Sequence, residues 1–548
     1  MSSSSPGAPS SRAAGLWARL RQPPFLLFLI IGPVIAFRLL PDEFHFNGDE
    51  MRHAVTGLFF RDLLVDFPWR NPLQYTYEYY SKYPALAVPH WPPLFHFIQG
   101  LFFLVFGISV WSSRLATLSF ALLGVYYWYR IAERVGDRQR AILSSLIFPL
   151  IPYVLLYERS TMLEIPLVAL CLGTIWFWLQ FLEHERAAHL WACAVFVVAA
   201  FLTAQKAIFL AFFLPLHFLL ERRFRLLKRW DVWLASALSI AVVVAWYLFS
   251  FQTLALSYER VAQSVVRVSH WPVLLYYLRA LYIQLGLVLM ILAGSGVVWA
   301  AVRAPRQHRF LLLWVFSCYL CFTYIREKDV RHTLVWIPPL VYFALLCIEG
   351  LFAHRKLALL ASSSLAIYVF VGALRYDRPR ITGVEDAAHF VLSLPESDIV
   401  YYHGFLNGDF IFYVRKYDPQ KSHMVARGKQ IVATKIVAGY GTREILQTPE
   451  EILDFFRSWG IRYALIENHE IIERQSIARA VLWSEQFELV RTFPIWTNIP
   501  DAAGRKILVF RYRGPLHRTA HDAVIPMMTL RDDIPANLDR LAGRPWPN

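Results

Sequence analysis

The stretch PPFLLFLIIGPVIAFRLLP, residues 23–41, is followed closely by FHFNGDEMRH, residues 44–53. The first is long and apolar enough to cross a membrane as a helix, and no A-x-A cleavage site follows it, so we expect a retained span. The second places the adjacent carboxylates Asp49 and Glu50 just beyond this crossing. Ionisable groups beside apolar spans are costly and tend to be functional, so the first external segment is where we expect a site.

The composition is that of a membrane protein. Of the 548 residues, 57% are hydrophobic and 17% are charged, and the mean hydropathy is +0.40. Soluble domains carry more charge, and repeated apolar runs of this length predict a polytopic α-helical membrane protein of about 11–13 spans. The expected helices are 24–40, 113–131, 141–157, 161–182, 189–203, 207–221, 231–250, 278–302, 310–325, 333–350 and 355–374. A further run, 94–108, is expected to lie in the interface or to re-enter it.

Positive charge is concentrated in short loops. The formal net charge is +15, which in a soluble protein would suggest a nucleic-acid partner. Here ERVGDRQR, ERRFRLLKRW, VRAPRQHR and HRK separate apolar runs, and loops of this kind are typically cytoplasmic. We therefore expect no nucleic-acid partner, a disordered cytoplasmic N-terminus over 1–23, and a C-terminus on the outer face.

The character of the chain changes after residue 375. DIVYYHG, RYALIE, FELVRTF and KILVFRYR predict strands, and TPEEILDFFRSWG predicts a helix with Thr448 as N-cap, Glu451 completing a capping box and Gly460 as C-cap. We expect a transmembrane domain over 24–374 with an external loop at 41–112, a periplasmic α/β domain over 375–515, and a loose, Pro-rich tail over 516–548.

Three groups of ionisable residues fall on the predicted outer face. Asp49 and Glu50 precede His53 by about one helical turn, Glu164 stands at the mouth of a helix, and Lys328 and Arg331 lie between two spans. If the substrate is a sugar linked through phosphate to a polyprenol, one carboxylate is needed to accept a proton and cations are needed to stabilise the departing phosphate. A glycosidase would need two carboxylates flanking one bond, so the pattern favours transfer over hydrolysis.

Metal and redox sites are weaker hypotheses. DEMRH differs from the zinc-protease motif H-E-x-x-H at its first ligand. A divalent cation held by Asp49, Glu164 and His53 remains an alternative, and no other cofactor is predicted. Cys318 and Cys321 lie within the apolar run WVFSCYLCFTYI, where packing is the better interpretation.

These segments, taken in order, resemble the GT-C superfamily of polytopic glycosyltransferases, and in particular the family-39-like branch related to protein O-mannosyltransferases and lipid A aminoarabinose transferases. GDEMRHAVTGLFFRDLL is similar to that family's first external loop, and YERSTMLEIPLVAL is similar to its second. HWPPLFHFIQGLFFLVFG, LTAQKAIFLAF and REKDVRHTLVWIPPL resemble its later elements. The resemblance covers roughly residues 20–340.

The resemblance implies roles for particular residues. Asp49 would be the catalytic base, with Glu50 and Glu164 as further acids of the site. The candidate donor-phosphate ligands are Lys328, Arg331, Lys82, Lys206 and Arg159. In relatives a lysine often precedes the paired prolines, and here Trp91 occupies that position. The resemblance therefore implies that Lys82 or His90 would take the place of that lysine in binding the donor phosphate.

Each residue also has a structural alternative. Asp49 could cap a helix, Glu164 could interact with a helix dipole, and Lys328 and Arg331 could reach towards headgroups. The tyrosines between 75 and 83 predict an interfacial aromatic belt in preference to a sugar-stacking surface.

The expected function is that of an integral membrane, inverting glycosyltransferase. It would move a sugar from a polyprenyl-phosphate donor to a lipid, glycan or protein acceptor on the outer face of a bacterial inner membrane. The alternatives are a flippase for lipid-linked sugars and a non-enzymatic sensor. A flippase would tend to have inverted repeats and broken helices, and the sequence shows neither.

Overall fold

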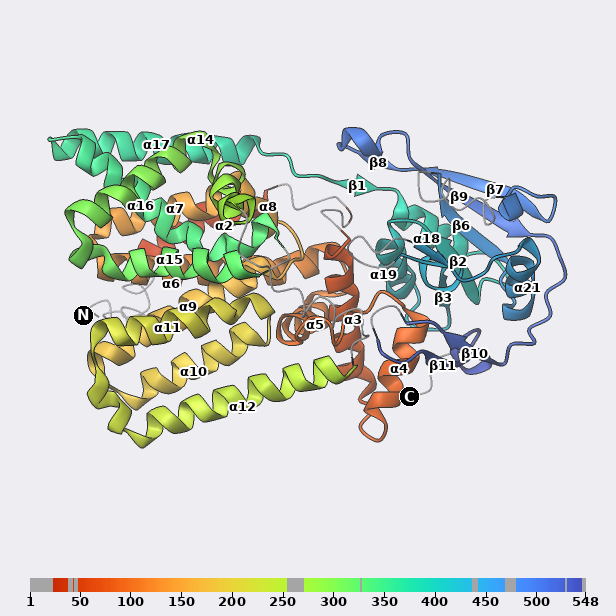
Figure 1. The fold of residues 1–548 in the computed structure, drawn as a ribbon. Coiled ribbons are helices and arrows are strands. Elements are labelled where there is room, and N and C mark those ends of the chain that lie inside the picture. Colours follow the sequence, from red (N-terminus) through yellow and green to blue (C-terminus); the bar gives the residue numbers. More distant parts are fainter. Residues whose placement is uncertain are drawn as a thin grey trace, which may run out of the picture.

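The structure is a computed structural model that describes residues 23–37, 43, 48–253, 271–325, 328–435, 442–468, 480–527 and 530–544. A bundle of long helices forms one half of the molecule, and a sheet with its own helices forms the other (Figure 1). The helices of the first external loop lie between the two halves. The predicted N-terminal segment before residue 23 lies outside the described residues, as do Arg326 and Glu327.

Each apolar run predicted to be helical is helical in the bundle. The turn between residues 150 and 152 divides the run 141–157 into two helices, and the run 333–350 begins with a 3₁₀ segment. The bundle elements are α2 (Pro23–Ala36), α6 (Val110–Val135), α7 (Arg138–Leu150), α8 (Pro152–Glu158), α9 (Glu164–His184), α10 (Ala187–Phe201), η1 (Gln205–Ala207), α11 (Ile208–Glu221), η2 (Phe224–Lys228), α12 (Trp230–Thr253), α14 (Trp271–Arg303), α15 (Pro305–Tyr324), η3 (Val330–Trp336), α16 (Ile337–Leu351) and α17 (Arg355–Arg375).

Several of these helices suit a bilayer. Among the described residues, five are long and apolar enough to cross a membrane by themselves, and α7 with α8 would make a sixth across a bend of 67°. The protein is thus a multi-pass membrane protein, while the expected number of spans stays a prediction. The bend also corrects the expectation that the chain has no broken helix: Pro152 begins α8, and proline cannot continue the hydrogen bonding of the preceding helix.

The first external loop is largely helical. It contains α3 (Glu50–Asp66), α4 (Pro72–Lys82) and α5 (Leu94–Phe106), so the run at 94–108 is a helix whose membrane placement stays a prediction. α3 and α5 pack closely because Gly57 carries no side chain: a Cβ there would lie 2.2 Å from the Gln99 Oε1 atom. This close packing fixes α3, the helix that begins directly after Asp49.

The tyrosine run does not form the predicted interfacial belt. Tyr75, Tyr79, Tyr80 and Tyr83 are buried in a hydrophobic core, and Tyr77 is the exposed member of the set. Their partners come from α3 and from the C-terminal domain, which were too distant in sequence to be anticipated.

The C-terminal domain is a mixed five-stranded sheet of order β3-β2-β6-β9-β7. The predicted strands appear as β2 (Ile399–His403), β6 (Tyr463–Glu467), β7 (Phe487–Pro494) and β9 (Lys506–Tyr512), joined by β3 (Met424–Arg427). β2 pairs in parallel with β3 and β6, and β9 pairs antiparallel with β6 and β7. The helices of this domain are α18 (Val384–Leu392), α19 (Asn407–Tyr417), α20 (Gly428–Ile431) and α21 (Pro449–Trp459). Two further pairs of short antiparallel strands are β1 (Ile381–Thr382) with β8 (Trp496–Thr497), and β4 (Ala433–Lys435) with β5 (Thr442–Glu444).

Helix α21 has the predicted ends. Thr448 and Glu451 form the reciprocal capping box, and Gly460 closes the helix in the left-handed conformation with a φ of 71°. These signals are local, which is why the sequence alone predicts them.

The segment after residue 515 is not the loose tail that its prolines suggested. Residues Asp522–Ile525 (β10) pair antiparallel with Ile534–Asn537 (β11), and a short helix, α24 (Leu538–Leu541), follows. β11 contacts α4 of the first external loop, and Arg540 lies 3.2 Å from the Glu78 carboxylate. The hairpin therefore packs on an element more than four hundred positions earlier in the chain.

The external loop and the C-terminal domain share one hydrophobic core. It combines Met51, Val55 and Phe59 of α3 with apolar residues of the sheet and of α19. A buried ion pair crosses the same interface, because Arg415 donates to both carboxylate oxygens of Asp62 at 2.7 and 2.8 Å. Glu43 adds a further tie by accepting hydrogen bonds from the backbone N–H groups of Gly383 and Val384, at the start of α18.

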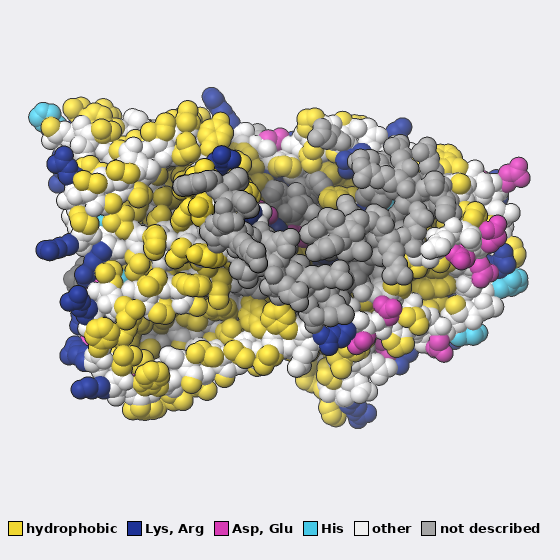
Figure 2. Space-filling model, viewed as in Figure 1, with side chains coloured by type: hydrophobic (Ala, Val, Ile, Leu, Met, Phe, Trp, Pro, Cys, Tyr) yellow, Lys and Arg dark blue, Asp and Glu magenta, His cyan; other side chains and the backbone are white. Residues whose placement is uncertain are grey.

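Charge is distributed unevenly between the ends of the molecule. Lys and Arg side chains gather at the end of the bundle that faces away from the C-terminal domain (Figure 2). Acidic side chains are prominent at the opposite end, and a broad apolar surface lies over the bundle between them. This is the arrangement that the basic loops of the sequence predicted.

Candidate functional site

Four ionisable side chains from distant parts of the sequence meet at the end of the bundle nearest the C-terminal domain. The Arg331 Nη2 atom donates to Asp49 Oδ2 at 3.1 Å, and the Arg331 Nε atom lies 3.6 Å from Glu164 Oε1. The same Glu164 oxygen accepts a hydrogen bond from Lys206 Nζ at 2.7 Å. Two carboxylates and two cations thus form one connected cluster, which we call the charge cluster.

Local structure explains how each member is placed. Asp49 occupies the N-cap position of α3, Glu164 is the first residue of α9, and Lys206 belongs to the short η1 turn. Arg331 lies on η3, whose first turn is capped by the Asp329 carboxylate accepting from the Arg331 backbone N–H at 3.0 Å. The bundle thus fixes the backbone positions of Glu164, Lys206 and Arg331, and α3 fixes that of Asp49.

The capping alternative for Asp49 finds no support among the described residues, because its side chain makes no hydrogen bond that caps α3. Its carboxylate pairs with Arg331 and is about one quarter exposed, while Glu164 is almost completely buried. Of the two acids, Asp49 is therefore the one that an incoming molecule could reach.

A small cavity adjoins the cluster. It has a volume of about 10 Å³ and is lined by Glu164, Lys206 and Arg331 together with His332 and apolar side chains of α9 and η3. A space of this size holds about one water molecule. The two cations are already paired with carboxylates in the structure. A ligand phosphate would have to displace these carboxylates in order to bind the cations.

His53 stands one helical turn after Asp49, and its hydrogen bonding defines its protonation. The Pro92 carbonyl can only accept a hydrogen bond, so His96 Nδ1, 3.1 Å away, carries a proton. His96 Nε2 then accepts from His53 Nδ1 at 2.9 Å. Burial, followed by the charge of nearby groups including His96 and Arg331, holds the pKa of His53 well below its usual value, so the imidazole is neutral and Nε2 keeps its lone pair.

Glu50 lies beside Asp49 in sequence but has a different environment. It is fully buried, and its Oε1 atom accepts from Arg114 Nε at 3.2 Å and from the Thr161 backbone N–H at 2.9 Å. Glu50 therefore joins α3 to α6 and to the turn before α9, while the catalytic role predicted for it stays a prediction.

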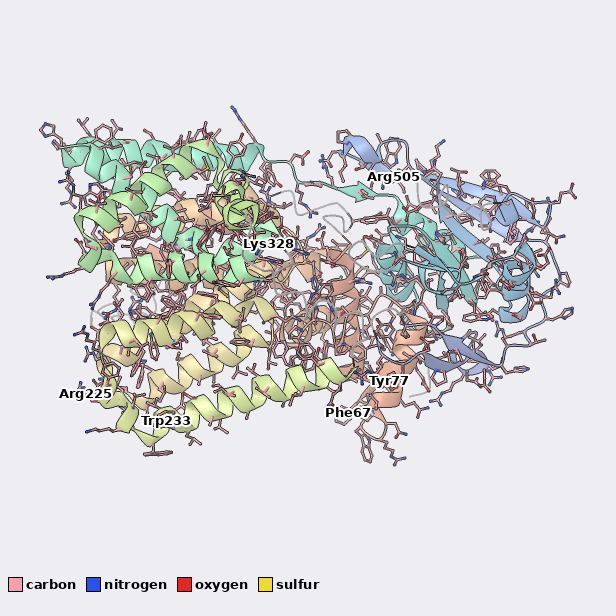
Figure 3. All side chains as sticks on the ribbon, in the orientation of Figure 1. Phe67, Tyr77, Arg225, Trp233, Lys328 and Arg505 are labelled. Carbon is pink, nitrogen blue, oxygen red and sulfur yellow. The ribbon has the colours of Figure 1, made fainter. Side chains whose placement is uncertain are left out.

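Three of the predicted phosphate ligands lie apart from the charge cluster or are held by backbone carbonyls. Lys82 is buried against the C-terminal domain and donates to the Lys421 carbonyl. Arg159 donates to the carbonyls of Val34, Ile35 and Tyr376, where it links the ends of α2 and α17. Lys328 donates to the carbonyls of Phe322, Thr323 and Ile325 at the end of α15, with its ammonium over the Tyr277 ring. Figure 3 shows Lys328 at the end of the bundle that faces the sheet domain.

The phosphate-binding roles of these three residues stay predictions. For Arg159 and Lys328 the contacts have a physical reason: helix C-termini leave carbonyl groups without intrahelical partners, and long cationic side chains are well suited to satisfy them. Sequence spacing cannot distinguish a cation used in this way from one that faces a ligand.

The predicted metal ligands are not grouped. Asp49 and Glu164 both contact Arg331, whereas His53 pairs with His96. Within the described part of the chain, no set of three or more histidine, cysteine, aspartate or glutamate side chains is arranged to hold a metal ion. The divalent site predicted from Asp49, Glu164 and His53 is therefore not formed here.

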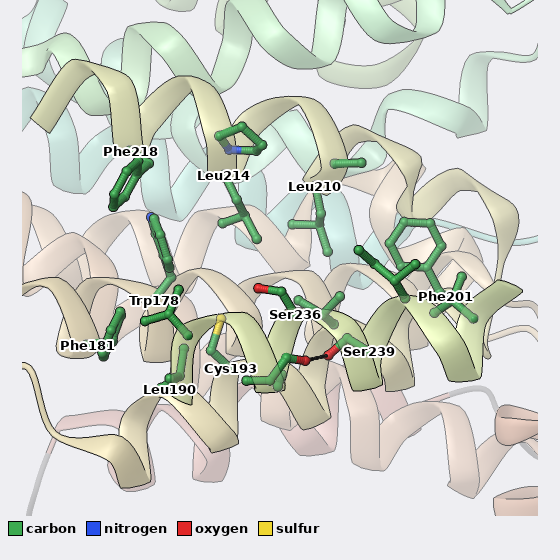
Figure 4. Close-up of a pocket in the computed structure, with 18 of the residues that line it drawn as sticks. Trp178, Phe181, Leu190, Cys193, Phe201, Leu210, Leu214, Phe218, Ser236 and Ser239 are labelled. Carbon is green, nitrogen blue, oxygen red and sulfur yellow. Dashed lines mark hydrogen bonds between the residues drawn. The ribbon is translucent and has the colours of Figure 1, made fainter. Parts of the chain in front are cut away.

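A second cavity, of about 530 Å³, lies between α9, α10, α11 and α12 (Figure 4). It is almost entirely apolar, with Trp178 and Phe181 near one end and Phe201 and Leu210 near the other. Leu210 is separated from Lys206 of the charge cluster by one turn of chain. The cavity is large enough for a hydrocarbon chain, and one of its lining residues is four positions from Lys206.

Sequence reasoning missed three residues that shape the site. Asp329, Arg114 and His96 orient Arg331, Glu50 and His53 respectively. Only Asp329 had a signal in the sequence, as an Asx-type cap two residues before Arg331. The other two depend on contacts between α3 and the helices α5 and α6 that no local pattern encodes.

Comparison with known proteins identifies relatives of this fold. Residues 90–249, which include Glu164 and Lys206, match the family model of dolichyl-phosphate-mannose-protein mannosyltransferases. No curated protein matches the sequence. Among solved structures, ArnT from Cupriavidus metallidurans in the apo state is 16% identical, with a TM-score of 0.56 over 90% of this chain and 99% of that chain.

Other solved structures have the same architecture. ArnT bound to undecaprenyl phosphate gives a TM-score of 0.57 at 16% identity, over 90% of this chain and 99% of that one. The Archaeoglobus fulgidus oligosaccharyltransferase in complex with zinc and sulfate gives 0.51 at 13% identity, over 85% and 70%. The mycobacterial arabinofuranosyltransferase AftD gives 0.51 at 13% identity, over 94% and 41%. At these identities the likeness establishes the fold.

Proposed function

We propose that this chain, which has the fold of the GT-C superfamily of membrane glycosyltransferases, transfers a sugar from a polyprenyl-phosphate donor to a hydroxyl or amine acceptor on the outer face of the membrane. The observation that carries the proposal is the charge cluster, in which the accessible carboxylate Asp49 pairs with Arg331 while Glu164 joins Arg331 to the second cation, Lys206. Undecaprenyl phosphate bound to ArnT, which shares this fold, supports a carrier of the same chemical class.

The cluster suits an inverting displacement. Asp49 would accept the proton of the acceptor hydroxyl or amine as its oxygen or nitrogen attacks the anomeric carbon. The bond between that carbon and the phosphate oxygen would break, and the electron pair would leave with the polyprenyl phosphate. Arg331 and Lys206 would stabilise the negative charge on that phosphate, and Glu164, which contacts both cations, would hold them in position.

The two halves of the carrier would have separate places. The phosphate would bind at Arg331 and Lys206 in exchange for their carboxylate partners. The isoprenoid chain would lie in the apolar cavity between α9 and α12, which begins within one turn of Lys206. No proton is needed by the leaving group, because the phosphate departs as an anion.

The charge distribution supports the membrane placement that we propose. The end of the bundle that is rich in Lys and Arg would face the cytoplasm, and the charge cluster and the C-terminal domain would lie in the periplasm of a bacterial inner membrane (Figure 2). The flippase alternative has less support, because the cluster stands at one end of the bundle and not along a path through it.

The test is transfer of radiolabelled sugar from polyprenyl-phosphate donors to candidate acceptors by purified protein. We expect Asp49→Asn to lower the rate by about 10²–10⁴-fold, the usual contribution of a general base. Asp377→Asn is the matched control, since Asp377 is an external, half-exposed carboxylate paired with Arg380. Transfer unchanged by Asp49→Asn would reject the assignment of the base, and lipid movement without a new glycosidic bond would favour the flippase.

A further inference from the structure

The loop between α3 and α4, with the adjoining ends of both helices, exposes an unusual amount of apolar surface. Val65, Phe67, Trp69 and Leu73 are 54%, 68%, 68% and 59% exposed, and we call these residues, with Arg70, the aromatic tip. The Arg70 guanidinium lies over the Trp69 ring, with 5.0 Å between its Cζ atom and the ring centroid. A soluble surface rarely collects large apolar side chains in one short loop without a partner.

The tip is held in this exposed arrangement by defined contacts. Phe67 ends α3 in the left-handed conformation, with φ 44° and ψ 59°, which a bulky residue rarely adopts. Next to it, Asp66 accepts from Tyr75 Oη at 2.6 Å and pairs with Lys421. The surrounding structure therefore fixes a loop conformation that turns the Phe67 ring outward.

The tip lies beside the outer end of a lipid-facing helix. α12 has 24 residues, so it is about 36 Å long and exceeds the roughly 30 Å hydrocarbon core of a bilayer. Its basic end joins η2, and its other end is bound to external segments: Thr253 accepts from the Arg531 N–H at 2.9 Å, and Ser250 donates to the Pro89 carbonyl at 2.9 Å.

Figures 1 and 3 draw the molecule from the same side. In that view the α3–α4 loop extends past the end of α12, and Phe67 and Tyr77 are drawn near that end. The C-terminal hairpin connects the two places, because β11 contacts α4 and the Arg531 N–H donates to Thr253. The last turns of α12 also expose apolar side chains, which include Leu248, Phe249 and Phe251.

We propose that the aromatic tip inserts into the headgroup region of the outer leaflet and so binds the C-terminal half of the molecule to the bilayer surface. Aromatic side chains with a neighbouring arginine are the composition that membrane interfaces favour. The acidic residues beneath the tip do not oppose this contact, because Asp66 pairs with Lys421 and Glu78 pairs with Arg540. The proposal does not depend on the catalytic assignment.

The test uses site-directed spin labelling of the full chain in nanodiscs of phosphatidylethanolamine and phosphatidylglycerol. A nitroxide is attached at Phe67→Cys, and in a second variant at Trp69→Cys. The control is Trp483→Cys, an exposed tryptophan of the C-terminal domain. All five native cysteines are buried, and unsubstituted protein gives the background labelling.

We expect the ratio of oxygen to nickel-chelate accessibility to be several-fold higher at positions 67 and 69 than at position 483, because oxygen concentrates in lipid and the chelate stays in water. Equal ratios at the three positions would overturn the proposal. Shielding of the tip from both reagents would also overturn it, since this would mean that protein covers the tip.

Discussion

Arg331 is the residue through which the charge cluster is connected. It contacts Asp49, Glu164 and Asp329, so it neutralises carboxylates contributed by three separate elements. A cation held in this way is already positioned for a phosphate, and little side-chain entropy remains to be lost on binding. Its removal should therefore affect donor binding more than folding.

A binding experiment tests this role without knowledge of the sugar. Polyprenyl phosphate alone should raise the unfolding midpoint of the wild-type protein in detergent. We expect Arg331→Met and Lys206→Met each to weaken binding about 10–100-fold, which corresponds to the loss of about 1.5–3 kcal/mol for a hydrogen bond to a charged group. Arg309→Met, which removes a surface pair with Glu221, is the control. Unchanged stabilisation of both cluster variants would contradict the role.

Lys82 leads to a prediction about how folding stability depends on pH. Burial, partly offset by Asp418, lowers the pKa of Lys82 from 10.5 to about 7. Because the unfolded chain then binds more protons between pH 7 and 10.5, this lysine makes folding stability rise with pH across that window. Below pH 7, Lys82 is protonated in the folded protein as well, so its charge is buried and the gain in folding stability is lost.

The measurement is the unfolding midpoint of wild type and Lys82→Met from pH 7 to 10. We expect the wild type to gain stability relative to the variant as pH rises. Parallel profiles would show that Lys82 keeps its ordinary pKa. The comparison with the variant cancels the titration of the other lysines and of the tyrosines.

Only part of the site could be predicted from individual residues. Asp49, Glu164, Lys206 and Arg331 were found because each combines an unusual charge with the end of an apolar run. Lys82 and Arg159 have the same signal, yet their partners lie 339 and 125 positions away in the chain. Nothing local distinguishes a cation that binds a carbonyl from one that faces a cavity, so the roles could be separated only in three dimensions.

At the scale of elements, the contact between α3 and α19 holds in place the helix that follows Asp49, the proposed base. Asp62 of α3 and Arg415 of α19 are both buried and form a bidentate ion pair. Removing one partner of such a pair leaves an unpaired buried charge, which usually costs about 3–5 kcal/mol. Because Asp49 precedes α3 directly, movement of this helix would also move Asp49.

The pair can be tested with single and double variants. We expect Asp62→Asn to lower the unfolding midpoint and to speed proteolysis at the connection between α17 and β1. The double variant Asp62→Leu with Arg415→Met should recover much of the loss, since apolar replacements of buried pairs are often tolerated. Arg511→Met, in an exposed pair with Glu488, is the control and should change the unfolding midpoint much less than Asp62→Asn. A loss in the control equal to that of Asp62→Asn would contradict this account.

The elements themselves were largely predictable, and their assembly was not. Apolar length determines the bundle helices, alternation of side chains determines β2, β6, β7 and β9, and the capping box determines the start of α21. The tyrosines of α4 were misassigned because an aromatic run has the same composition at a membrane interface and in a core. The sequence did not predict the β10–β11 hairpin, because prolines such as Pro535 are typical of segments without regular structure.

For the whole molecule, the C-terminal hairpin is predicted to be essential. Its buried residues include Ile525, Ile534 and Leu538, and it contacts both α4 and the end of α12. We expect deletion of residues 520–548 to lower the unfolding midpoint by several degrees and to reduce transfer activity. Truncation after residue 544, which keeps the hairpin, is the matched control. Full stability of the longer deletion would show that the hairpin is only an appendage.

The core shared by the external loop and the C-terminal domain also constrains the order of biogenesis. Asp62 is synthesised 353 positions before Arg415, its partner. The apolar face of α3 must therefore stay uncovered until the C-terminal domain has been synthesised. A nascent chain thus lacks half of this core until its final segment is made, and a chaperone would have its greatest effect during that interval.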